Sequence, residues 1–194
     1  MQARPTSLSR RSWRSVTDAI LMSVWLFSLI PNVVNAGESL EEQKLRQEAI
    51  FFRNFLSFVQ WPDESTETKP AMFQMCLDGN AALGLALSSE LRATTVDERK
   101  VHVRLVKTER DFKGCEALMV DDLGQTEIAK MLRAVRNSRV LTFGQTEGFL
   151  EAGGVVQLSK DERGFQFVIN LEAARNTGIT LDARLLRLAK RVVR

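Results

Sequence analysis

Residues 149–169 read FLEAGGVVQLSKDERGFQFVI, and this stretch decides what kind of sheet the chain forms. Two apolar segments, Val155–Leu158 and Phe165–Ile169, flank the polar sequence SKDERG, which ends in glycine. Apolar runs on both sides of a polar turn that contains glycine are typical of a β-hairpin. The stretch therefore predicts two antiparallel strands near the end of the chain.

Upstream of this hairpin, segments with strand and helix patterns alternate. We expect strands at Met72–Leu77, Lys100–Lys107, Cys115–Val120 and Arg139–Phe143, and helices at residues 39–60, 81–91, 125–136, 171–178 and 181–193. Alternation of the two patterns implies parallel strands joined by crossover helices. The sequence thus predicts an α/β fold, namely a three-layer α/β/α domain with a mixed, mostly parallel sheet and a C-terminal β-hairpin.

Local signals mark where several helices begin and end. Ser39 followed by Glu42 is a capping-box pattern that starts a helix. Trp61-Pro62 should end that helix, because proline disfavours the helical conformation in the residue before it. Asn170 directly precedes the short sequence LEAARNTG, so we expect it to cap a helix there.

The paired glycines Gly153 and Gly154 raise the question of a nucleotide site. A phosphate-binding loop needs Lys-Ser or Lys-Thr after its glycines, and a dinucleotide loop needs spaced glycines between a strand and a helix. Here Val155-Val156 follow, and the glycines precede a strand. We expect instead that they allow a tight turn with positive φ into that strand.

The N-terminus has the parts of a secretory signal peptide. Arginines at positions 4, 10, 11 and 14 precede the apolar run Ala19–Ile30, and short residues lead to Ala36. We predict that residues 1–36 are cleaved off before Gly37, which leaves residues 37–194 as the exported domain. An uncleaved membrane anchor is the alternative, but about 12 apolar residues fall short of the roughly 20 that span a bilayer.

The formal net charge of +3 belongs to this N-terminal segment. Without residues 1–36, the chain carries equal numbers of basic and acidic residues. Net charge therefore gives no reason to expect nucleic-acid binding.

Two cysteines, Cys76 and Cys115, remain in the predicted exported domain. An even pair in an oxidising compartment usually forms a disulfide, with two buried free thiols as the alternative. His102 lies on the strand face opposite Val101 and Val103, where we expect a surface residue. Two cysteines and one histidine make a structural metal site improbable.

The sequence does not predict a catalytic site. It contains no Gly-x-Ser-x-Gly motif, and its one histidine lies on a strand. The acidic pairs Asp121-Asp122 and Asp161-Glu162 should be solvated loop residues. We therefore expect a non-enzymatic binding domain with no catalytic residues, metal or cofactor.

An ordered set of motifs resembles the YfiR-like family of periplasmic regulators. The motifs are FFRNFLSFVQWP (Phe51–Pro62), FQMCLDGN (Phe73–Asn80), GCEALMV (Gly114–Val120), VLTFGQTEGFLEAGGVVQL (Val140–Leu158) and FQFVINLEAARNTGITLDARLLRLAKRV (Phe165–Val192). The resemblance makes Trp61, Pro62, Gly153, Gly154 and Asn170 family-motif residues. It also supports pairing of the two cysteines.

The resemblance implies a function and partners. Such proteins repress a membrane-bound diguanylate cyclase through its periplasmic sensor region, and so control cyclic-di-GMP signalling and biofilm formation. An OmpA-like outer-membrane lipoprotein can sequester the repressor, and a homodimer is implied. This chain departs from the family pattern at two places. Glu116 replaces the histidine that commonly follows the second cysteine, and Asp182-Ala183 lie near the position where a Ser-Ser pair commonly opens the last helix. A periplasmic sensor of small ligands is the alternative function, because open α/β sheets have a crevice at the strand ends.

Overall fold

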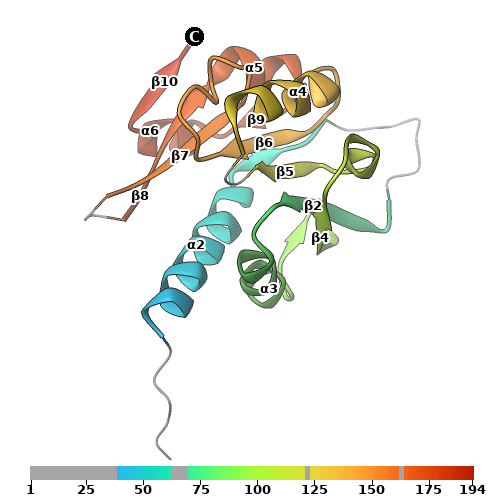
Figure 1. Ribbon diagram of the computed structural model, residues 1–194, viewed down its shortest axis with the longest axis vertical. Helices are drawn as coiled ribbons and strands as arrows, with labels where there is room; N and C mark the ends of the chain where they lie inside the picture. Colours follow the sequence, from blue (N-terminus) through green and yellow to red (C-terminus); the bar gives the residue numbers. More distant parts are fainter. Residues whose placement is uncertain (1–38, 63–69, 121–122, 162–163) are drawn as a thin grey trace, which may run out of the picture. The chain divides into compact units, whose positions relative to one another are not determined.

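The computed structural model describes residues 39–62, 70–120, 123–161 and 164–194 (Figure 1). The predicted signal peptide and the Asp121-Asp122 pair lie outside these residues. The described residues form an eight-stranded sheet with the order β10-β8-β7-β6-β5-β2-β4-β3. Its strands are β2 (Met72–Asp78), β3 (Thr95–Val96), β4 (Arg99–Val106), β5 (Ala117–Val120), β6 (Leu141–Gly144), β7 (Val156–Asp161), β8 (Gly164–Asn170) and β10 (Arg191–Val193).

The sheet is mixed and mostly parallel. Among its strand pairs, β7–β8 and β3–β4 are antiparallel, and the other neighbours are parallel. β7 and β8 form the predicted hairpin, with Val156 opposite Ile169. The mixed sheet and the hairpin that the sequence predicts are therefore confirmed.

Helices cover both faces of this sheet. Alternate residues of a strand point to opposite faces, and Met75 and Leu77 of β2 belong to one apolar cluster whereas Cys76 belongs to another. The first cluster includes buried residues of α2 (Leu40–Leu56), α3 (Ala81–Glu90), α5 (Leu171–Asn176) and α6 (Ala183–Leu188). The second includes residues of α4 (Gln125–Val135) and of the 3-10 helix η2 (Glu109–Phe112). The three layers match the predicted α/β/α class.

The predicted capping signals are present. Ser39 and Glu42 form a complete capping box at the start of α2. Asn170 caps α5, since its Oδ1 accepts a hydrogen bond from the Ala173 amide at 2.9 Å. Asp182 caps α6 by accepting from the Arg184 amide.

In two predicted helices, the last residues form a strand instead. The closing helix was predicted over Leu181–Val193, but α6 ends at Leu188, and Arg191–Val193 pair in parallel with β8. The Lys190 amide donates to the Phe167 carbonyl, and the two β-branched valines suit a strand better than a helix. The helix predicted for residues 39–60 ends at Leu56, because β1 (Val59–Gln60) pairs with β9 (Thr180–Leu181) in a second, two-stranded sheet.

Phenylalanines join α2 to the sheet. The rings of Phe52 and Phe55 meet the Phe143 ring of β6 edge-on, at centroid distances of 5.0 and 5.1 Å. On the hairpin side, Phe51 contacts Phe165 and Phe167 at 5.6 and 5.7 Å. Aromatic pairs of this kind contribute about 1 kcal/mol each beyond the area they bury, so α2 is held mainly by its second half.

The hairpin extends past the strand beside it. β7 pairs with β6 only at Val156 and Gln157, whereas its pairing with β8 continues to Asp161. The outer part of the hairpin therefore rests on α2 through Phe51 and not on another strand of the described sheet (Figure 1).

The two consecutive glycines serve different purposes. Gly153 has φ +98°, as expected for a tight turn. Gly154 is not in the left-handed region, but a Cβ there would lie 2.1 Å from Cε1 of the fully buried Phe149 ring. A Cβ on Gly144 would meet the opposite edge of the same ring, at 2.3 Å from Cδ2. Both glycines thus make room for Phe149.

A disulfide joins Cys76 of β2 to Cys115, which precedes β5, and confirms the predicted pairing. The chain-entropy estimate for a closed loop of this length is about 4 kcal/mol of stabilisation. Arg104 lies over the bridge, and its Nη2 donates to the carbonyls of Asp111 and Lys113 at 2.7 and 3.1 Å. The disulfide and Arg104 together hold the segment between β4 and β5 against the sheet.

We predict that Gly154→Ala lowers the free energy of unfolding by about 3 kcal/mol, because the new methyl group would overpack Phe149. Gly153→Ala is the matched control. A Cβ at position 153 would meet no atom within 4 Å. This variant should therefore lower the free energy of unfolding by only about 1–2 kcal/mol, through its backbone conformation alone. Urea unfolding measures both.

The double variant Gly154→Ala/Phe149→Leu tests the cause. If the clash with the ring is responsible, Gly154→Ala should cost much less in the Phe149→Leu background than in the wild type. Equal costs in both backgrounds would contradict this explanation.

Candidate functional site

The amino ends of the parallel strands form one edge of the sheet, and three of the predicted family-motif or disulfide residues meet there. Trp61, Pro62 and Cys115 line a hollow of about 320 Å³ at this edge. Its other lining residues are Pro70, Asp97, Arg99, Phe112, Lys113, Gly114, Glu116, Ser138, Arg139 and Val140. We call it the amino-edge hollow.

An ion pair forms one wall of the amino-edge hollow. Arg99, the first residue of β4, donates from Nη1 and Nη2 to the two carboxylate oxygens of Glu116, at 3.0 and 2.6 Å. The side chains are 10% and 19% exposed, so both charges are largely removed from water. Such two-pronged, charge-assisted contacts are stronger than ordinary hydrogen bonds. The Nε atom of Arg99 is buried and has no hydrogen-bond partner among the described residues.

Glu116 also joins the strands around the hollow. Its carboxylate accepts from the Gln74 amide of β2 at 3.1 Å, and its backbone carbonyl accepts from Nε1 of Trp61 at 3.2 Å. The Trp61 ring in turn meets Phe73 edge-on at 4.7 Å. Because the carboxylate is engaged by Arg99 and Gln74, the geometry suits a rigid binding wall better than acid–base chemistry.

The remaining family-motif residues lie nearby but separately. Gly153 and Asn170 line a second hollow of about 560 Å³, which shares Val140 with the first. Asn170 also donates from Nδ2 to the Leu150 carbonyl at 3.3 Å, so it joins α5 to the turn before β7. Gly154 lines neither hollow and contacts Phe149 instead.

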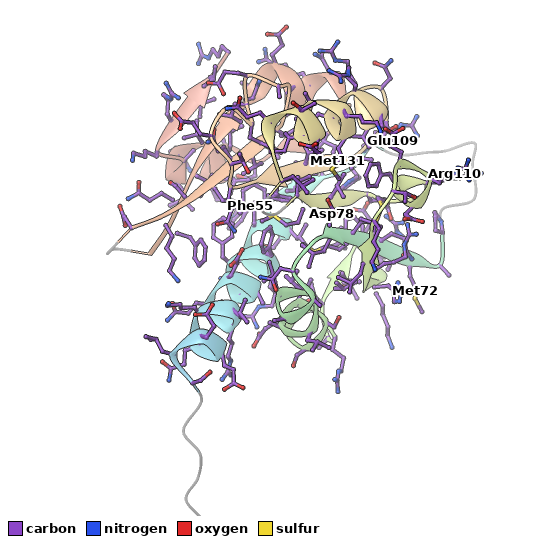
Figure 2. The ribbon with its side chains drawn as sticks, in the orientation of Figure 1. Phe55, Met72, Asp78, Glu109, Arg110 and Met131 are labelled. Carbon is purple, nitrogen blue, oxygen red and sulfur yellow. A yellow bond between two sulfur atoms is a disulfide. The ribbon has the colours of Figure 1, made fainter. Side chains whose placement is uncertain are left out.

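A crevice of about 580 Å³ lies at the opposite, carboxyl edge of the sheet. From β2 the chain crosses first to β4 on one side and then to β5 on the other, and ligands of open α/β sheets bind where strand order reverses in this way. The lining residues are Asp78, Lys107, Thr108, Glu109, Arg110, Phe112, Leu123, Glu127, Lys130 and Met131, four of which are labelled in Figure 2. We call it the carboxyl-edge crevice.

Asp78 is the chemically unusual residue of this crevice. Burial raises the pKa of its carboxyl group above the ordinary value. The charges around it are mixed, and Lys130 on α4 pairs with Glu109 at 3.3 Å. Polar groups of both signs beside Phe112 and Met131 suit a small molecule that carries both charge and an apolar part.

Sequence reasoning did not identify Arg99 or Asp78 as site residues. Asp78 directly follows a buried strand, in MCLDGN, and a polar residue at that position is a usable signal for a site at the carboxyl edge. Arg99 gave no such signal, because its partner Glu116 lies 17 residues further along the chain, beyond the end of β4. His102 is exposed as expected, with its Nδ1 at 3.1 Å from Oε1 of Gln74.

The described residues contain neither a metal-binding cluster nor a membrane-spanning helix. No group of three or more histidine, cysteine, aspartate or glutamate side chains there is arranged to hold a metal ion. In that same part of the chain, no helix is long and apolar enough to cross a membrane.

We predict that Asp78→Asn raises the urea midpoint at pH 7. The raised pKa means that the folded state binds the proton more tightly than the unfolded state does, so the charged carboxylate costs stability above the folded pKa. The gain should shrink as the pH falls through the folded pKa, because Asp78 then binds its proton in the folded state. Glu147→Gln, on an exposed turn, is the control, and a gain that does not depend on pH would contradict the burial argument.

Comparison with solved structures shows similarity at low sequence identity. A conserved domain protein from Vibrio cholerae O1 biovar El Tor strain N16961 matches with a TM-score of 0.48 and 15% identity, over 76% of this chain and 60% of that one. An ABC domain from Streptococcus pneumonia, solved in complex with L-Trp, matches with a TM-score of 0.51 and 12% identity, over 77% of this chain and 62% of that one. The chain thus spans less than two thirds of either structure, and the second likeness shows a shared fold.

The family comparison covers most of the chain. No protein of curated function matches. The sequence profile described as YfiR/HmsC-like matches residues 46–190, which include β1 to α6 and both cysteines of the disulfide. The chain therefore belongs to the YfiR/HmsC-like family.

Proposed function

We propose that this protein is a periplasmic regulatory binding protein that represses a membrane-bound diguanylate cyclase through the cyclase's periplasmic sensor region. The family match over residues 46–190 is the observation that carries this proposal. The repressor would thereby control cyclic-di-GMP signalling and biofilm formation. It would act by binding and not as an enzyme.

The features of the molecule support a role in binding. The disulfide, the Arg99–Glu116 pair and the Trp61 contacts make the amino edge rigid. A preorganised surface loses little conformational freedom when a partner binds, which favours affinity. In this proposal residues 1–36 direct export and are removed, and residues 37–194 act in the periplasm. The cysteine pair would then form its bridge in an oxidising compartment.

Two further partners belong to the same proposal. An OmpA-like outer-membrane lipoprotein would sequester the repressor and release the cyclase, and the repressor would form a homodimer. Sedimentation of the exported protein over a range of concentrations would report the dimer.

We predict that the exported protein, lacking residues 1–36, captures a membrane cyclase with a periplasmic sensor domain from detergent-solubilised membranes. Deletion of the gene should raise cellular cyclic-di-GMP, because repression is lost, and expression of the wild-type chain should restore it. Mass analysis of the purified protein reports the cleavage, and mass spectrometry of the captured material identifies the cyclase. Unchanged cyclic-di-GMP after deletion in every growth condition would reject the proposal.

A second function is favoured by the carboxyl-edge crevice, namely sensing of a small periplasmic ligand. The crevice lies at the strand-order reversal, and Asp78 there is a partly buried carboxylate. The streptococcal domain of similar fold was solved with L-Trp, so amino acids are the first compounds to screen.

For this second function we predict a rise in the melting temperature with an amino acid in excess, because a ligand that binds only the folded state stabilises it. Asp78→Asn should reduce the rise, and Glu147→Gln should leave it unchanged. A screen of amino acids and other small metabolites that shifts no melting temperature would reject this function and leave the first intact.

A further inference from the structure

One face of β4 carries basic side chains that the layers of the domain do not cover. Along this strand, Val101 and Val103 pack against the first apolar cluster, whereas Lys100, His102 and Arg104 point to the other side. Lys100 and His102 are exposed and Arg104 is half-buried. A strand inside an α/β/α sheet is normally apolar on both faces, so this alternation marks a face that is open to solvent.

The neighbouring residues show where the open face ends. Toward the carboxyl ends of the strands, Cys76 and Val106 are buried beneath the second apolar cluster. Toward the amino ends lies Met72 of β2, which is labelled in Figure 2 and is paired in register with Lys100. Its side chain is 47% exposed. Gln74, in register with His102, is half-buried and contacts the imidazole. The layer that contains η2 and α4 thus leaves the first half of β2 and β4 uncovered.

No ion pair joins these basic groups to an acid in the part of the chain that the structure describes. Arg104 donates to neutral carbonyls, and the carboxylate of Asp111 accepts from the amides of Lys107 and Thr108 and from the Thr108 hydroxyl. Glu116 is engaged by Arg99. Within the described residues, no ion pair involves Lys100 or Lys113. We call Lys100, His102, Arg104 and Lys113 the basic face.

Two features beside the basic face suit an extended polypeptide. β3 pairs with the outer edge of β4 at Arg99 and Lys100, and the Val101 amide donates to the Thr94 carbonyl just before β3. Among the described strands, the edge of β4 beyond Val101 has no neighbour. Lys113 also lines the amino-edge hollow, where Pro62 and Pro70 offer apolar surface. Exposed strand edges bind extended peptides through backbone hydrogen bonds, while adjacent side chains give specificity.

We propose that the basic face is the docking surface for an extended acidic segment of a protein partner. Alternate residues of an extended segment point to the same side, as Lys100, His102 and Arg104 of β4 do. Carboxylates at these alternate positions of the segment would therefore lie beside the three basic side chains. An apolar side chain of the segment would enter the amino-edge hollow beside Lys113. Identification of the partner as the cyclase sensor region rests on the proposed function, whereas the surface and its chemistry do not.

The test uses the exported chain and a fluorescent poly-glutamate peptide, with anisotropy measured at low and high ionic strength. The wild type should bind, and binding should weaken as salt screens the charges. Lys100→Gln/Lys113→Gln should weaken the affinity on the order of ten-fold. Arg175→Gln/Lys190→Gln removes the same charge from exposed positions elsewhere and should bind like the wild type. Unchanged urea midpoints show that both variants fold.

The other outcomes count against either the inference or the proposed function, and they distinguish the two. Equal losses in the two double variants would show attraction by net charge alone, and absence of peptide binding would reject an acidic protein ligand. Binding to phosphatidylglycerol vesicles but not to the peptide would assign the surface to lipid instead. In the membrane capture experiment, peptide binding without cyclase capture would reject the proposed function alone. Undiminished capture of the cyclase by Lys100→Gln/Lys113→Gln would reject the docking surface alone.

Discussion

The ring of Phe149 lies between Gly144 and Gly154, and this contact makes the connection from β6 to β7 possible. The two strands are parallel, and parallel neighbours are usually joined by a crossover helix. Here residues 145–155 make the connection with turns, and Phe149 supplies the buried aromatic side chain that joins them to the α4 side of the sheet. Because β7 starts from this connection, the position of the hairpin, and of β10 beside it, depends on the fit of one ring between two residues without a Cβ.

The sequence predicts the long, strongly patterned elements, and it fails where a contact distant in the chain decides. The alternation of strands and helices, the hairpin and the caps at Ser39 and Asn170 depend on local chemistry, and they are present. β1, β9 and β10 are strands of two or three residues that exist because a partner strand is in place. The role of Gly154 is hidden for the same reason, since a tight turn and a missing Cβ beside a ring have the same sequence signature.

The candidate sites follow the same rule. Trp61 and Cys115, singled out from sequence motifs, lie in one hollow, but the pairing of Arg99 with Glu116 beside them depends on the order β5-β2-β4 in the sheet. The result is a domain whose two sheet edges differ. The amino edge is rigid and contains the Arg99–Glu116 ion pair, whereas the carboxyl edge contains a partly buried carboxylate whose pKa is raised. A binding partner and a small ligand could therefore use opposite edges without competing.

The outer half of the β7–β8 hairpin rests on α2 through Phe51, and beyond Gln157 it has no strand of the described sheet along its β7 edge. The same helix is fixed to β6 by the contacts of Phe52 and Phe55 with Phe143. The position of the outer hairpin strands therefore depends on aromatic side chains of α2, the first helix of the described chain, and not on pairing with β6.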